Sequence, residues 1–249
     1  MRAAWSVWAL RAGRSRMDQS LATYLDGMGK ALTIPHTMFL LSGSRVVLVD
    51  TSFESAQAVR DAYPQEVWRD PDEEPLALLA GLGVAPEQVE IVVCSHLHYD
   101  HCGSNRQFSQ ARVVVQRTEL EYALHPTATI MEREFFSPSG GFRPPFDPTH
   151  MDLIDGDSQL LEGLSLLHLP GHTPGSQGVV IATDQGPLGL LGDNVMVAEN
   201  WASNVPVGLH TDLDAWYRSM AKARAVVERV VPSHDMRVFA GGQPVVRIA

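Results

Sequence analysis

The chain has 249 residues, of which 45% are hydrophobic and 19% are charged, so it can bury a large core as one domain or two fused halves. Its formal net charge of -10 repels phosphate backbones, which argues against a nucleic-acid partner and against RNA processing. Its two cysteines, Cys94 and Cys102, are too few for a disulfide framework, which favours a cytoplasmic protein.

The first fifty residues predict strands on either side of a long loop. Residues 5–10 alternate loosely and predict an edge strand. The apolar piece at residues 3–10 is too short and interrupted for a signal peptide or a membrane span. Residues 11–34 hold several glycines among residues of mixed polarity and predict a long loop, a kind of segment that often carries function. Residues 36–41 and 45–49, separated by Ser-Gly-Ser, predict a β-hairpin.

Helices and buried strands are predicted in the rest of the first half. Residues 55–63 form a helix candidate, and residues 76–82 repeat apolar residues at helical spacing before a glycine. Between these helices, the charged residues 69–74 predict a solvated loop. Strands are expected at residues 89–94 and 113–115, followed by a helix at 118–125 with Thr118 as its N-cap.

The second half follows a loop rich in proline and glycine at residues 137–148. Further elements are an amphipathic helix at 213–227 and strands at 164–169, 179–181, 188–191 and 230–231. Strand runs and interspersed helices in both halves predict two sheets packed face to face with helices outside. We expect one domain over residues 1–249, with sandwich halves at roughly 1–125 and 150–249 joined by that loop.

The strand at residues 89–94 runs directly into a cluster of metal-ligand residue types: His96, His98, Asp100 and His101. Imidazole and carboxylate hold zinc and similar divalent metals, and such a cluster is costly to bury unless something binds it. Other ligand types follow predicted strands of the second half: His172, Asp193 and His234. The repeated order of strand, tight turn and ligand predicts a metal site that both halves build.

This pattern resembles the metallo-β-lactamase superfamily, whose His-x-His-x-Asp-His signature stands at residues 96–101. The resemblance implies an αββα four-layer sandwich with two divalent metal ions. It places one metal on His96, His98 and His172 and the second on Asp100, His101 and His234, with Asp193 bridging them. Zinc is the expected metal, although a nitrogen and oxygen ligand set would also take manganese, cobalt or iron.

Several segments are similar to the N-acyl-homoserine lactonase family, and together they cover nearly the whole chain. They are residues 114–125, 169–175 and 199–201, and an N-terminal stretch with Ala12-Gly13-Arg14, Asp18, Gly29-Lys30 and Ile34-Pro35. The resemblance implies hydrolysis of a lactone ring by a metal-bridging hydroxide, with Asp100 and Asp193 as catalytic residues. Asp100 would pass a proton to the leaving group. The resemblance also implies a homodimer paired through the N-terminal loop.

One position departs from the lactonase pattern. The family carries a tyrosine three residues after the bridging aspartate, where it donates a hydrogen bond to the substrate carbonyl, but this chain has Met196. Methionine cannot donate, and a lost donor of this kind costs about 3 kcal/mol of transition-state stabilisation. Other substrate-site candidates could supply the donor: Tyr24, His36, Asn194 and His210.

The N-terminal loop carries apolar residues that have two interpretations: Met17, Leu21, Tyr24, Leu25 and Met28. They could line a pocket for an acyl chain, or they could pack against the sheets or a dimer partner. The aromatic residues Phe142 and Phe146 in the later loop leave the same two interpretations open.

Two rival functions remain beside the lactonase. The same metal site could hydrolyse another lactone, a cyclic amide, a thioester or a β-lactam, although retention of Asp193 argues against the β-lactamase branch. An iron oxidoreductase resembling persulfide dioxygenases would use a single iron, which a full second site including His234 disfavours. Acid release from a substrate panel and metal analysis separate these functions.

Overall fold

The computed structural model describes residues 5–62, 65–127 and 146–249. The Pro/Gly-rich loop expected at 137–148, with Phe142, therefore lies for the most part outside the described residues, as does the end of the helix expected at 55–63. Phe146 is described, and it is buried in the core.

The larger sheet has the strand order β13-β1-β2-β3-β5-β6-β7, with β4 paired to β1. Strand β1 runs antiparallel to both of its neighbours, whereas β3, β5, β6 and β7 are parallel to one another. The strands are β1 (Ser6–Asp18), β2 (Ala31–Ser42), β3 (Val46–Val49), β4 (Val67–Trp68), β5 (Ile91–Val93), β6 (Arg112–Gln116), β7 (Met151–Ile154) and β13 (Val245–Arg247). Both β7 and β13 belong to the second half of the chain but complete the sheet of the first.

The smaller sheet has the order β12-β11-β10-β9-β8. Its strands are β8 (Ser158–Leu161), β9 (Leu164–His168), β10 (Gln177–Thr183), β11 (Gly186–Leu190) and β12 (Arg229–Val230). Because β10 is antiparallel to both neighbours and β12 is parallel to β11, strands β9, β11 and β12 all end at the same edge.

Alternating side chains divide the core between the two faces of the larger sheet. On β2, Phe39 and Leu41 point into the cluster shared with the smaller sheet, whereas Met38 and Leu40 point to the opposite face. Helices α3 (Pro75–Gly81) and α5 (Arg117–Leu124) cover that opposite face. Burying both faces explains why β5 is a continuous apolar run.

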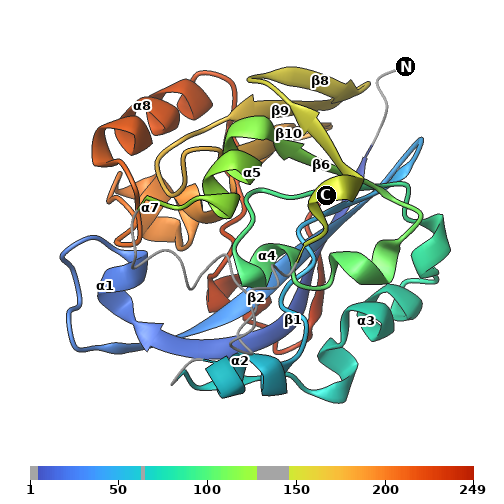
Figure 1. Ribbon diagram of the computed structural model, residues 1–249, viewed down its shortest axis with the longest axis horizontal. Coiled ribbons are helices and arrows are strands. Elements are labelled where there is room, and N and C mark those ends of the chain that lie inside the picture. The colour runs from blue at the N-terminus through green and yellow to red at the C-terminus, as the bar shows by residue number, and fades with distance from the viewer. Residues whose placement is uncertain (1–4, 63–64, 128–145) are drawn as a thin grey trace.

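Helix α8 (Leu213–Arg224) covers the outer face of the smaller sheet, where Trp216 and Met220 pack with Leu167 and Leu169. In Figure 1, α8 and α3 lie on opposite sides of the molecule with the strands of both sheets between them. The order of helices, sheet, sheet and helices confirms the αββα sandwich.

The other α-helices of the described residues are short: α1 (Gln19–Ala22), α2 (Ala56–Ala62), α4 (Tyr99–Cys102) and α7 (Ala198–Ala202). Among all helices of the described chain, none combines the length and the apolar character needed to cross a bilayer.

The long loop expected over residues 11–34 is wrong at both ends, because strands β1 and β2 extend far into it and leave only residues 19–30, with helix α1, between them. Their register shifts between Arg11 and Arg14, where Gly13 has φ +122°, and pairing then continues to Asp18 opposite Ala31. A bulge that only glycine accepts comfortably thus bends the hairpin without ending it. The edge position expected for residues 5–10 is also wrong, because β13 pairs with the outer side of β1.

The solvated loop expected at residues 69–74 is wrong at Glu73, whose side chain is buried. Its carboxylate accepts hydrogen bonds from Nε of Arg11 at 2.6 Å, Nη2 of Arg14 at 3.0 Å and the backbone N–H of Asp70 at 3.0 Å. Partners more than fifty residues away therefore draw this acidic side chain under β1, a placement that local composition cannot indicate.

Replacing Glu73 by Ala should lower the free energy of unfolding by about 3–5 kcal/mol, because it leaves the guanidinium of Arg11 buried without its counter-ion. The matched control is Glu90→Ala, which removes the exposed ion pair with Arg45 and should cost at most about 1 kcal/mol. Urea unfolding of both variants measures the difference, and equal effects would contradict the structural role given to Glu73.

Candidate metal centre

The predicted ligand residues come from strand ends of both sheets. β5 ends at Val93 and leads into His96 and His98, while the single turn of α4 carries Asp100 and His101. The turns after β9, β11 and β12 carry the other three: His172, Asp193 and His234. The structure brings all seven side chains together, as the order of strand, turn and ligand predicts.

The first cluster consists of three buried imidazoles. Nδ1 of His98 lies 2.9 Å from Nε2 of His96 and 3.0 Å from Nε2 of His172, and the two Nε2 atoms are 3.2 Å apart. Burial, followed by the neighbouring imidazoles, lowers the pKa of His96 and His98 well below the usual value. Neutral imidazoles that direct ring nitrogens at one point offer the lone pairs a divalent metal needs.

The second cluster adds carboxylates to imidazoles. Nε2 of His101 and Nε2 of His234 are 3.2 Å apart, and Oδ2 of Asp100 lies 3.7 and 3.8 Å from them. Oδ1 of Asp193 lies 3.2 Å from Nε2 of His101 and 3.1 Å from Nε2 of His234. The other oxygen of Asp193, Oδ2, lies 3.7 Å from Nε2 of His172. The two oxygens of one carboxylate therefore face the two clusters.

Hydrogen bonds on the far side of the rings fix three of the histidines. In each, Nδ1 donates outward: His101 to Oδ2 of Asp50 (2.8 Å), His172 to the carbonyl of Leu209 (2.6 Å) and His234 to the carbonyl of Pro35 (2.7 Å). This sets the tautomer and leaves each Nε2 lone pair directed inward, as metal-ligating histidines require. None of these three acceptors was predicted from the sequence. The only indication was the position of Asp50 directly after β3.

The electrostatics of the second cluster favour positive charge at its centre. Burial alone would lower the pKa of His101 and His234, but Asp193 and Asp100 reverse this effect and raise both pKa values. Burial likewise acts to raise the pKa of Asp193, and His101 and His234 bring it well below the usual range. Carboxylates that favour a proton on these imidazoles equally favour a divalent cation between them, so the donor set fits a metal pair.

The buried carboxylate of Glu119, which was not predicted as a site residue, joins the loop after β5 to the turn after β9. Glu119 on α5 accepts hydrogen bonds from the N–H of Leu97 at 2.9 Å, the N–H of Gly175 at 3.1 Å and the hydroxyl of Thr173 at 2.6 Å. Leu97 lies between two first-cluster histidines, and Thr173 follows the third. Helix α5 begins at Arg117 with Gln116 as its N-cap, so the N-cap expected at Thr118 is wrong. Glu119 lies in the first turn of this helix, and its side chain is buried.

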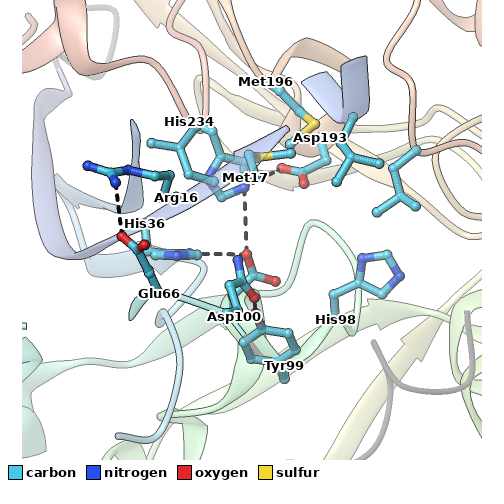
Figure 2. Close-up of a pocket in the computed structure, with 14 residues that line it drawn as sticks. Arg16, Met17, His36, Glu66, His98, Tyr99, Asp100, Asp193, Met196 and His234 are labelled. Carbon is cyan, nitrogen blue, oxygen red and sulfur yellow. Dashed lines mark hydrogen bonds and ion pairs between the residues drawn. The ribbon is translucent and has the colours of Figure 1, made fainter. Parts of the chain in front are cut away.

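A cavity of about 400 Å³ opens onto the second cluster (Figure 2). Three of the predicted substrate residues line it: Met17, His36 and Met196. Figure 2 places Met196 beside Asp193, and His36 beside Asp100. The apolar wall also includes Leu21, Ile34 and Leu209.

The other three substrate candidates lie elsewhere. Asn194 is buried, and its amide donates to the carbonyl of Leu169 at 2.6 Å and accepts from the N–H of His172, so it holds the ligand turn. Tyr24 and His210 pack edge to face at 4.9 Å, and His210 lines a neighbouring cavity of about 650 Å³. None of these three residues is among those that line the cavity at the second cluster.

The apolar residues of the N-terminal segment lie in different surroundings. Met17 and Leu21 line the cavity, as an acyl-chain site requires. Leu25 and Met28 project into solvent with exposed fractions of 66% and 70%.

The two cysteines, Cys94 and Cys102, lie on either side of the ligand residues 96–101. Both are buried and form no disulfide, and burial raises the pKa of Cys94 to about 12.

Comparison with known proteins agrees with this geometry. Residues 33–234 match the family model of the metallo-beta-lactamase superfamily. An N-acyl homoserine lactonase of Bacillus sp is 30% identical over 94% of this chain and 95% of its own length. The N-acyl homoserine lactonase AttM of Rhizobium radiobacter is 31% identical over 96% of this chain and 93% of its own.

Solved structures extend the likeness to the whole fold. An N-acyl homoserine lactone hydrolase with N-hexanoyl-L-homoserine bound at its catalytic metal centre has a TM-score of 0.80 and 25% identity over 100% of both chains. A mutant of AiiA from B. thuringiensis with N-decanoyl-L-homoserine bound at its active site has the same TM-score and identity over the same share of both chains.

Glu119 should make the stability of the metal-free protein depend on pH. Burial raises its pKa to about 7, and the hydrogen bonds from Thr173, Leu97 and Gly175 offset only part of that effect. Between the unfolded pKa near 4.5 and about 7, the native state holds more protons than the unfolded state, so stability should fall as pH rises.

Chelator-treated wild type should lose up to about 3 kcal/mol of unfolding free energy across this window relative to Glu119→Gln, which cannot ionise. Urea unfolding at pH 4.5, 6 and 7.5 measures the difference. Parallel curves for the two proteins would contradict the raised pKa.

Proposed function

Because the chain belongs to the metallo-beta-lactamase superfamily, we propose that it opens the lactone ring of an N-acyl-homoserine lactone with two metal ions bound. The chain is a metal-dependent hydrolase of the lactonase kind. The observation that carries the proposal is the placement of Asp193, whose two oxygens face the two ligand clusters. A single carboxylate positioned in this way is suited to bridging two cations.

The proposed ligand assignment follows the clusters. The first metal would be held by His96, His98 and His172 and the second by Asp100, His101 and His234, with Asp193 available to both. Zinc is the proposed metal, because it takes nitrogen and oxygen ligands of these kinds. When bound, the two ions supply a water of lowered pKa as the nucleophile and positive charge that stabilises the carbonyl oxygen.

Asp100 is proposed to move the proton. Its side chain is 14% exposed and lines the cavity, so its carboxylate reaches both the ligand cluster and the substrate space. It takes a proton from the attacking water and returns it to the ring oxygen as the ester C–O bond breaks, which leaves an open-chain hydroxy acid. The aspartate is unchanged at the end of the cycle, and no serine or cysteine nucleophile is needed.

The cavity wall supports an acyl substrate. Met17, Leu21 and Leu209 line the same cavity as the ligand residues, and each offers an apolar surface for an alkyl chain. Two of the relatives hold N-hexanoyl- and N-decanoyl-L-homoserine, one at its catalytic metal centre and the other at its active site. A small-molecule substrate is therefore the proposed partner; a homodimer and a cytoplasmic location stay predictions.

Met196 keeps a second hydrolytic function open: a different lactone, a cyclic amide or a thioester. Its thioether lines the cavity beside Asp193, and it cannot donate the hydrogen bond that the family tyrosine supplies. A substrate whose carbonyl needs no donor from the protein would suit this pocket. An iron oxidoreductase is disfavoured, because the second cluster offers a full set of ligands.

Acid release by the zinc-loaded protein should be fastest with N-acyl-homoserine lactones in a panel of aliphatic and aromatic lactones, a thioester, a cyclic amide and a β-lactam. Asp193→Ala should lose metal and activity together, because both clusters lose the shared carboxylate. Metal analysis and a pH-indicator assay measure the two losses. Wild-type activity confined to the amide or the thioester would overturn the substrate proposal, and activity that survives metal removal would overturn the mechanism.

Replacing Met196 by Tyr should raise kcat on the lactone about 10-fold or more over Met196→Phe, because only tyrosine adds a hydroxyl donor at the carbonyl. The phenylalanine variant controls for the aromatic volume. Initial rates at saturating lactone measure the ratio. Equal rates in the two variants would mean that catalysis here uses no donor at this position.

A further inference from the structure

His36 lies on β2 in the cavity wall, and both of its ring nitrogens are engaged. Nδ1 is 3.1 Å from Oδ2 of Asp100, and Nε2 is 3.0 Å from the hydroxyl of Ser15. His36 is 1% exposed and Ser15 is fully buried. A side chain held at both ends in this way is poorly placed to serve as a free donor to substrate.

The direction of this chain of hydrogen bonds is set by its end groups. An ionised carboxylate can only accept, so Nδ1 of His36 carries the hydrogen that Asp100 receives. Nε2 of the neutral ring then accepts from the hydroxyl of Ser15. The order is Ser15 to His36 to Asp100, and it ends on the oxygen that faces the second ligand cluster.

Packing holds the ring of His36 in this orientation. The ring meets Phe53 edge to face at 5.0 Å and His234 edge to face at 5.4 Å. The preceding residue, Pro35, accepts the hydrogen bond from Nδ1 of His234. Two consecutive residues of β2 thus contact two side chains of the second cluster, His234 and Asp100.

We propose that His36, supported by Ser15, is a positioning residue that fixes the Asp100 carboxylate and so retains the second metal. This inference rests on the proposed dinuclear site. A hydrogen-bond donor behind a ligating carboxylate limits its rotation and sets which lone pair faces the metal, and loss of such a partner weakens metal binding about 10- to 100-fold. The contacts of His36 are with the second cluster, so its effect falls on the second metal rather than the first.

The alternative is that His36 is itself a ligand, since its nitrogen, an Asp100 oxygen and a His234 nitrogen lie within 4.8 Å of one another. The 3.1 Å contact with Asp100 favours the positioning role, because that separation is a hydrogen-bond distance. Two substitutions separate the roles. The amide nitrogen of Asn lies as many bonds from Cα as Nδ1 of His, and the amide nitrogen of Gln lies as many as Nε2.

The test compares wild type, His36→Asn, His36→Gln and Ser15→Ala as full-length protein loaded with two equivalents of zinc. Chelator titration with an indicator dye monitors the release of each equivalent, and the absorption spectrum of the cobalt-loaded protein reports ligand geometry. His36→Gln should release the second equivalent about 10-fold more readily, with the first unchanged. His36→Asn should stay within about threefold of wild type, because its amide can still donate to Asp100.

Ser15→Ala provides a variant that leaves the cavity wall intact and keeps the test valid if His36→Gln does not fold. It should weaken the second equivalent about threefold and, at saturating zinc, lower kcat with KM unchanged. Equal metal release in all four proteins, or equal weakening of both equivalents, overturns the positioning role. Complete loss of the second equivalent in His36→Asn also overturns it and makes His36 a ligand. A wild type that binds fewer than two equivalents overturns the dinuclear proposal as well.

Discussion

Electrostatic balance at one buried point is the constraint on which the rest of the structure depends. Five imidazoles and two carboxylates converge there, and nearly all of this polar surface is removed from water. Without a partner of positive charge, the carboxylates keep protons on neighbouring histidines, as the raised pKa of His101 and His234 indicates. Divalent cations satisfy the same charges better, so metal binding and the stability of this region are coupled.

The two sheets meet these demands jointly. The first cluster takes two histidines from the loop after β5 and one from the turn after β9, and Glu119 fastens these two segments to each other. The second cluster takes one histidine from α4 and one from the turn after β12. Two neighbouring residues of β2 contact it: the carbonyl of Pro35 accepts from His234, and the imidazole of His36 contacts Asp100.

Proposed metal ligands and apolar side chains line the same cavity. The ligands among its lining residues are His98, Asp100, Asp193 and His234, and the apolar side chains include Met17, Leu21 and Leu209. Met196 lies beside Asp193, and His36 lies beside Asp100 (Figure 2). We therefore expect the departure from the lactonase pattern at Met196 to affect the substrate, and the contact between His36 and Asp100 to affect the second metal.

The sequence by itself determined which side chains converge and how the layers are stacked. Its His-x-His-x-Asp-His run and strand-end residues predicted all seven side chains of the centre, because parallel strands deliver the residues after them to a common edge of the sheet. Strand runs and interspersed helices in both halves likewise predicted two facing sheets. The full length of the β1–β2 hairpin was not predicted, because the bulge at Gly13 interrupts the strand pattern of the sequence without ending the strand. The roles of Asp50, Glu119 and the partners of His36 were decided only by tertiary structure, because their hydrogen bonds join residues 21 to 64 positions apart along the chain.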